Sequence, residues 1–437
     1  MITAEPIGIP VRWFKRAFAV QERKELEPGA LLERAVTLAR QIDNPFERAV
    51  ALADVSRYQA EMGDRSGAMS TVQNALAGVG GIRSDAWRER ALDFIARSQT
   101  EMDDQGGAYA TACKIQNASL RAAAFVNVAE AQATAGDVVG ALATAHNIDD
   151  ASLRAAALVF IAESQANAGD VASALATAHG IADAFWGAAA LAKIASAQAG
   201  LGDWEGAIST ARKALATERR IAHASRPIAG PSWRISSAPW CRIADSPWSW
   251  QAYLITGIVE ALAKAGDVDG ALATARDIDN AWSRATGLAT VAATQAEVGD
   301  RQGVVSTMRE AFIAINEVED AAMCAGVVCV LAEIQLKVGD LAKASETAET
   351  IQSQALKATA LAEIARARAQ AGDRQGAADT FRDALAHAPE DQRGAILGIQ
   401  AETGDVATAL KSVEAIKSHA LRAMALAEIA ARLAATR

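Results

Sequence analysis

The sequence predicts an all-α protein, an α-solenoid of about ten stacked helix-turn-helix repeats. A Gly-Asp pair recurs along the chain, and most of the gaps between successive aspartates are 32 or 33 residues. Apolar residues at helical spacing occur on both sides of each pair. A repeat of this length is typical of stacked helical hairpins. The turn aspartates are Asp64, Asp104, Asp137, Asp170, Asp203, Asp267, Asp300, Asp340, Asp373 and Asp405.

Each repeat is predicted to contain two amphipathic helices. In the copy from Asp150 to Ile181, side chains spaced at i, i+3, i+4 and i+7 form one stripe in each helix. The stripes are Leu158, Ile161, Ala162 and Gln165 in the first helix, and Ala174, Leu175, Ala178 and Ile181 in the second. Because a hairpin of alanine-rich helices buries little area by itself, we expect its stability to come from stacking on its neighbours.

The Gly-Asp pair supplies the turn chemistry. Glycine adopts the left-handed conformation that ends a helix, and the aspartate carboxylate caps the next helix. Asp103 replaces the glycine once, in a conformation that Asp tolerates better than most residues. Two gaps of 40 residues add about two helical turns, so we expect longer helices there. Caps for the following first helices are predicted at Asn44, Asn117, Asp150, Asp183 and Asn280.

The pattern resembles the tetratricopeptide repeat family. The resemblance rests on the Gly-Asp turn, the spaced Leu and Ile of the first helix, and an alanine four residues after the aspartate, as at Ala141 and Ala174. It covers the chain from about Glu27 to Ala435. It implies a right-handed superhelix whose inner face, formed by the first helices, binds a ligand.

The chain divides into four predicted segments. Residues 1–27 are an N-terminal segment that could form a capping helix, and 28–220 are the first block of repeats. Residues 221–249 are an irregular stretch that takes the place of one hairpin. Residues 250–437 are the second block, in which Leu421–Leu433 is expected to be an unpaired helix that caps the end.

Composition limits the partners. The net charge of −9 argues against nonspecific nucleic-acid binding, which needs Lys and Arg to neutralise phosphates, and no specific nucleic acid is expected. The four cysteines lack paired spacing and the N-terminus lacks a signal-peptide core, which favours a cytoplasmic protein. The segment Val11–Val20 mixes basic and aromatic residues, but a helix over the first repeat is the preferred interpretation and membrane contact is not expected.

No catalytic, cofactor or metal motif is found, so we expect neither an enzyme nor a bound cofactor. His146 and His179 occupy equivalent places in adjacent repeats, but other repeats carry arginine there and no third ligand is evident. The glutamine five residues before the turn, as at Gln165, lies on the apolar stripe. A buried amide must find partners, so its preferred role is a hydrogen bond to a neighbouring turn, the alternative being a polar ladder in a binding groove.

Seven residues before the turn aspartate, the side chain varies between repeats. By the family resemblance this face looks into the groove, so varied side chains there predict contacts to an extended ligand; a solvated face would vary as well. The candidate partner-binding residues at this position are Arg57, Arg97, Glu130, Glu163, Glu260, Glu333 and Arg366.

A stretch rich in tryptophan and proline, residues 226–250, interrupts the repeats between Asp203 and Asp267. It belongs to a basic island that includes Arg212, Lys213, Arg219 and Arg220. Three interpretations are open: a loop that grips a partner, tryptophans that fill the gap of a missing hairpin, and a locally shifted reading frame. The candidate binding residues are Trp233, Arg234, Trp240, Arg242, Trp248 and Trp250.

The function predicted from the sequence is a non-catalytic scaffold that binds a partner protein or extended peptide along the concave face of the solenoid. The alternative is a small-ligand sensor or enzyme in which the tryptophan-rich stretch forms a lid over a cavity. A compact pocket with converging polar groups near Trp233–Trp250 would favour the alternative.

Overall fold

The structure is a computed structural model that describes residues 27–223, 247–318 and 321–435. These residues form two compact units. Unit 1 comprises the two ends of the chain, residues 1–82 and 390–437, and unit 2 comprises residues 83–389. Within the described residues every element is helical, which confirms the predicted all-α architecture of helix-turn-helix repeats.

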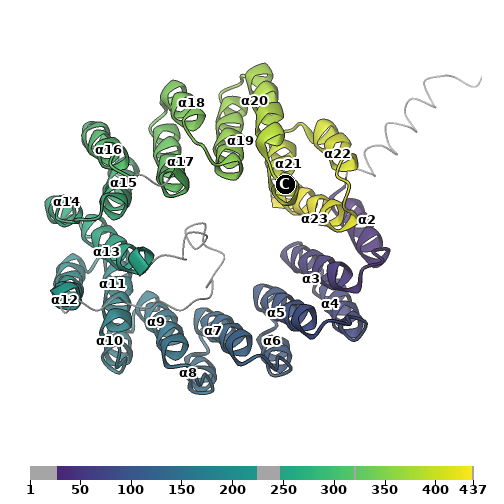
Figure 1. Ribbon diagram of the computed structural model, residues 1–437, viewed down its shortest axis with the longest axis horizontal. Helices are drawn as coiled ribbons and strands as arrows, with labels where there is room; N and C mark the ends of the chain where they lie inside the picture. The colour runs from purple at the N-terminus through teal and green to yellow at the C-terminus, as the bar shows by residue number, and fades with distance from the viewer. Residues whose placement is uncertain (1–26, 224–246, 319–320, 436–437) are drawn as a thin grey trace, which may run out of the picture. The chain divides into compact units, whose positions relative to one another are not determined.

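Ten hairpins follow one another along the described chain, each made of a first and a second helix (Figure 1). The first helices are α3 (Pro45–Glu61), α5 (Asp85–Glu101), α7 (Ala118–Thr134), α9 (Ala151–Asn167), α11 (Ala184–Gly200), α13 (Pro247–Lys264), α15 (Ala281–Glu297), α17 (Ala321–Lys337), α19 (Gln354–Gln370) and α21 (Arg393–Glu402). The second helices are α4 (Arg65–Val79), α6 (Gln105–Ala112), α8 (Val138–His146), α10 (Val171–His179), α12 (Trp204–His223), α14 (Val268–Arg276), α16 (Arg301–Ile315), α18 (Leu341–Glu349), α20 (Arg374–His387) and α22 (Val406–Glu414). Helices α2 (Pro28–Arg40) and α23 (His419–Ala435) lie at the two ends, and the short 3₁₀ helix η2 (Glu390–Gln392) precedes α21.

The turns have the predicted chemistry. Nine glycines before the turn aspartates have φ between 81° and 96°, and Asp103 adopts φ 64° in the remaining copy. The carboxylate of Asp170 accepts from the amide of Ser173, and most of its counterparts cap the second helix in the same way. The five predicted first-helix caps all accept amide hydrogen bonds. The two 40-residue gaps lengthen the second helix, since α4 and α16 have 15 residues where α8 and α10 have nine.

The repeated glutamine is structural. In the α5–α6 hairpin, Gln99 donates to the turn aspartate Asp104 at 2.9 Å and accepts from Thr111 at 2.7 Å. The Thr–Gln bond recurs between Thr177 and Gln165 at 2.8 Å. In the α19–α20 hairpin an arginine replaces the amide, and Arg368 donates to Thr380 at 2.9 Å. The tie joins the two helices of a hairpin near the turn, which confirms the preferred interpretation of these residues.

Unit 1 pairs the two ends of the chain. Helix α23 packs against α2, and also against α3 and α21, so that α2 serves as the second helix of the last hairpin (Figure 1). The expectation that Leu421–Leu433 forms an unpaired end cap was therefore wrong. Leu426 and Ile429 of α23 are 1% and 0% exposed, because they are enclosed between helices from both termini.

The stretch between α12 and α13 does not take the place of a hairpin. Helices α11 and α13 pack directly against each other, as successive first helices do elsewhere in unit 2, and no repeat is missing between them. The spacing of 64 residues suggested a lost repeat, but it results from a 20-residue second helix followed by an inserted segment. Pro247 does not break a helix either, because it begins α13, where a missing amide hydrogen is tolerated.

Candidate partner-binding surface

Two positions of each first helix form the candidate surface. They lie seven and ten residues before the turn aspartate, on one face of the helix, and we call them the first-helix row. Every row side chain that the structure describes is half-buried or exposed, although the residues around it in the helix are largely buried. The members ten residues before the turn, which the sequence analysis did not select, include Asp54, Phe94, Phe160, Lys193 and Glu363.

In unit 2 the row joins adjacent helices α7, α9 and α11. Lys193 of α11 forms an ion pair of 3.1 Å with Glu163 of α9. Burial, together with the nearby Glu163 carboxylate, raises the pKa of Glu130 to about 7, and Lys193 partly offsets this rise. The structure thus brings the predicted residues Glu130 and Glu163 together and adds a lysine that the sequence analysis missed.

A second group in unit 2 lies on α17 and α19. Burial and the nearby Glu363 raise the pKa of Glu333, and the Cys329 thiol lies 3.8 Å from the Glu333 carboxylate. Burial and that carboxylate raise the pKa of Cys329 to about 12, so its thiol remains protonated and is a poor nucleophile. Arg366 pairs with Glu363 on its own helix.

The row residues of unit 1 are joined by a network that connects both chain ends. Arg57 pairs with Asp54 at 3.0 Å and lies over the ring of Tyr58 at 4.0 Å. The Tyr58 hydroxyl donates to Glu428 of α23, whose carboxylate also accepts from Arg432 at 2.6 Å. Burial, with help from the surrounding carboxylates, raises the pKa of Tyr58 above its usual range, so the phenol keeps the proton that it donates.

Arg97 and Glu260 have partners only on their own helices. Arg97 makes a long ion pair of 3.9 Å with Asp93, and Glu260 pairs with Lys264 at 2.6 Å. Alongside Arg97, α5 exposes Trp87 and Phe94, whose side chains are 48% and 43% exposed. The sequence carries the signal for these aromatics, because they lie ten and three residues before Arg97 and share its helix face.

The candidates of the tryptophan-rich stretch fall largely outside the described residues. This holds for Trp233, Arg234, Trp240 and Arg242 and for the proposed lid, whereas Trp248 and Trp250 lie in α13. Of the basic island, Arg212 pairs with Asp267 at 3.3 Å and Arg219 with Asp277 at 3.2 Å, so these two arginines attach α12 to the ends of α14. Val11–Val20 also lies outside the described residues.

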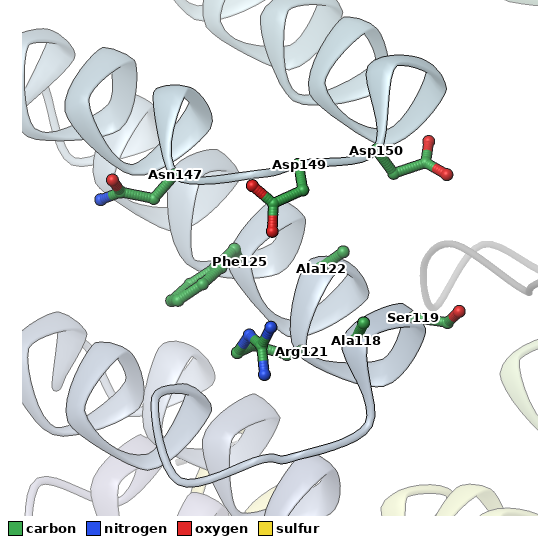
Figure 2. Close-up of a pocket in the computed structure, with 8 residues that line it drawn as sticks. All are labelled: Ala118, Ser119, Arg121, Ala122, Phe125, Asn147, Asp149 and Asp150. Atoms are coloured by element: carbon green, nitrogen blue, oxygen red, sulfur yellow. The ribbon is translucent and has the colours of Figure 1, made fainter.

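A small pocket of about 120 Å³ lies between α7 and the turn that precedes α9 (Figure 2). Its central cation, Arg121, donates at 3.0 Å to the carbonyl of Ile115, six residues earlier. The same bond recurs as Arg154 to Ile148 at 2.8 Å and in three other repeats. Arg121 therefore fastens the joint between two hairpins, and the pocket does not provide the converging polar groups of a dedicated ligand site.

In the described part of the chain, no group of three or more metal-ligating side chains is present. None of the helices described is long and apolar enough to cross a bilayer.

Comparisons with known proteins were then made. No family model and no curated protein matches the chain. Similar solved structures include a human IFIT1 dimer with m7Gppp-AAAA, which is 12% identical, with 90% of this chain and 94% of that one covered and a TM-score of 0.31. They also include Naa15/Naa10 bound to HypK-THB, at 14% identity, 93% and 75% coverage and a TM-score of 0.25. A circular tandem repeat protein with novel repeat topology is 13% identical, with 87% and 89% covered and a TM-score of 0.20. At these scores the similarities carry no argument about a ligand.

Proposed function

We propose that the protein is a non-catalytic scaffold of the tetratricopeptide-repeat type, which acts in the cytoplasm and binds a partner protein or extended peptide along the first-helix row. The supporting observation is the contrast between constant and varied positions. The turn, cap and glutamine positions keep nearly the same residue types and contacts from hairpin to hairpin, whereas the row carries acids, bases, aromatics and small residues in half-buried places.

The physical basis is that a rigid repeated framework holds the varied side chains at regular intervals. Each hairpin contacts its neighbours, so the spacing between row members follows from helix packing and not from loop conformation. Half-buried charges such as Glu163 and Lys193 are restrained by their 3.1 Å ion pair, and a partner meets them with little further loss of side-chain entropy. Trp233, Arg234, Trp240 and Arg242 could add contacts from the inserted stretch, and that contribution is part of the proposal.

The test is a capture experiment from native lysate with matched charge reversals. Glu130→Lys with Glu163→Lys alters the row of α7 and α9. Asp269→Lys with Glu346→Lys makes the same charge change at exposed sites on second helices α14 and α18. A partner that the control retains and the row variant loses, with equal circular dichroism, supports the proposal. A partner that both variants retain, together with a Trp233→Ala/Trp240→Ala variant that also retains it, contradicts it.

A further inference from the structure

Helix α5 presents an aromatic and arginine stripe. Its members Trp87, Arg90, Phe94 and Arg97 are three or four residues apart and so share one face of the helix. We call this set the α5 stripe. Trp87 and Phe94 are among the most exposed large apolar residues that the structure describes, at 48% and 43%. Exposed aromatic rings cost hydration free energy in a free protein, and they mark interaction surfaces when they occur together.

The repeat itself provides a comparison for Trp87. Trp186 of α11 lies at the same place, 17 residues before its turn aspartate, yet it is 6% exposed. It packs edge-on against Phe185, with 5.2 Å between ring centres. Within unit 2, α11 has first helices α9 and α13 on both sides, whereas α5 has only α7. A tryptophan at this place fills the core in one hairpin and leaves its ring accessible in the other.

The arginines of the stripe accompany the rings. The Arg90 guanidinium lies 5.9 Å from the centre of the Trp87 ring, and that of Arg97 lies 5.9 Å from the Phe94 ring. These distances are at the outer limit of a cation–π contact, so the arginines keep donors for a partner. Asp93 between them is the nearby counter-charge, and burial raises the pKa of its carboxyl while the two arginines lower it. The exposed face is therefore apolar with a positive balance.

The spacing selects the shape of the partner. The two aromatic residues are seven residues apart and so are the two arginines, which corresponds to about 10.5 Å along the helix. A second helix lying along α5 presents its own side chains with the same seven-residue repeat. Apolar side chains of that helix would pack against the rings, and carboxylates one helical turn away would reach the guanidinium groups.

We propose that the α5 stripe binds an amphipathic helix of a partner protein in which apolar residues and Asp or Glu each recur every seven residues. This inference rests on the proposed scaffold function and names the partner class for one part of the first-helix row. Stacked bases with phosphates would also suit aromatic and arginine side chains. The helical partner is favoured because Asp93 lies in the stripe and the whole chain carries a net charge of −9, both of which repel phosphates.

The experiment is selection from a displayed library of 18-residue helical peptides, with the positions of a seven-residue repeat randomised and the intact protein as bait. We expect enrichment of Leu, Phe, Asp and Glu at those positions. A selected peptide should bind at least tenfold more weakly to the Trp87→Ala/Phe94→Ala variant, measured by fluorescence anisotropy. Trp204→Ala removes an equally exposed tryptophan, 51%, from second helix α12 and should leave the affinity unchanged.

Charge reversal gives a second, independent readout. Selection on an Arg90→Glu/Arg97→Glu variant should enrich Lys and Arg in place of Asp and Glu. No acidic preference with the native protein, equal binding by the aromatic variant, or tighter binding of a 20-residue oligothymidine that depends on Trp87 would overturn the inference. If selected peptides instead lose affinity only in the Glu130→Lys/Glu163→Lys variant, the scaffold function stands and the α5 assignment fails.

Discussion

The two units are built from the same hairpin but differ in how the chain supplies it. In unit 2 the eight hairpins from α5–α6 to α19–α20 follow one another in sequence. In unit 1 the middle hairpin takes its first helix, α23, from the C-terminal end and its second helix, α2, from the N-terminal end. The packing of a hairpin therefore does not need a short turn. When both connections are treated as flexible chains, closing several hundred residues instead of about 33 costs roughly 2 kcal/mol more.

The largest expected effect is on unit 1 when α23 is removed. Deleting residues 419–437 should abolish the protection of α2 and α3 against amide hydrogen exchange, because their contacts with Leu426 and Ile429 disappear. Protection in α9 and α11 should persist, since unit 2 retains its neighbours. Removing only residues 436–437 is the control. Unchanged protection of α2 in the longer deletion would show that the two ends do not depend on each other.

A single cavity should separate the units more finely. Leu426→Ala in α23 and Leu153→Ala in α9 each truncate a leucine that is 1% exposed. Each should lower the free energy of unfolding of its own unit by about 2–5 kcal/mol. Hydrogen exchange monitored by mass spectrometry assigns the loss to a unit. If Leu426→Ala accelerates exchange equally in α9, the units unfold together and the comparison between them breaks down.

The pH dependence should be specific to unit 2. Because the folded-state pKa of Glu130 is raised to about 7, folding favours its protonated form. The unfolded carboxyl releases its proton near its model value of 4.5, so the stabilisation present below that pH is lost as the pH rises to about 7. Glu130→Gln should remove this slope and stabilise unit 2 by roughly 1–3 kcal/mol at pH 8. Urea unfolding at pH 5 and pH 8 measures it; a variant with the native slope would rule out Glu130 as its source.

The smallest expected effect concerns the polar connection across unit 1. Tyr58→Phe removes the hydroxyl that donates to Glu428 but leaves Arg432 beside that carboxylate. The free energy of unfolding of unit 1 should fall by about 1–2 kcal/mol, which is the range for a hydrogen bond to a charged group. Tyr109→Phe in α6 of unit 2 is the matched control. An equal loss in the control would mean that the bond between chain ends has no special weight.

Local chemistry made the hairpins predictable, and distance along the chain hid their pairing at the ends. The Gly-Asp turns, caps and glutamine ties act between residues within about 12 positions, so the sequence of one repeat contains both partners, as with Gln165 and Thr177. Helices α2 and α23 are nearly 400 residues apart, and no short-range pattern connects them. The inserted stretch after α12 misled for a different reason, because its length imitates a repeat.

For the candidate surface, the sequence located one position of the row and missed its neighbour. Varied residues such as Glu130 and Arg97 were selected by their place before the turn, and the same rule applied three residues earlier would have added Lys193 and Phe94. Exposure could not be predicted this way. Trp87 and Trp186 occupy equivalent places, and only the number of flanking helices within unit 2 distinguishes them.

Pairing α2 with α23 has a consequence for synthesis. Helix α2 leaves the ribosome among the first elements, with Leu31 and Leu32 awaiting the enclosure that leaves them 2% and 5% exposed in the finished protein. At about 5–20 residues per second, its partner emerges on the order of a minute later. A nascent chain that stalls before residue 419 therefore displays an uncovered apolar helix, which is the kind of surface that chaperones and proteases recognise. Completion of the last helix conceals it.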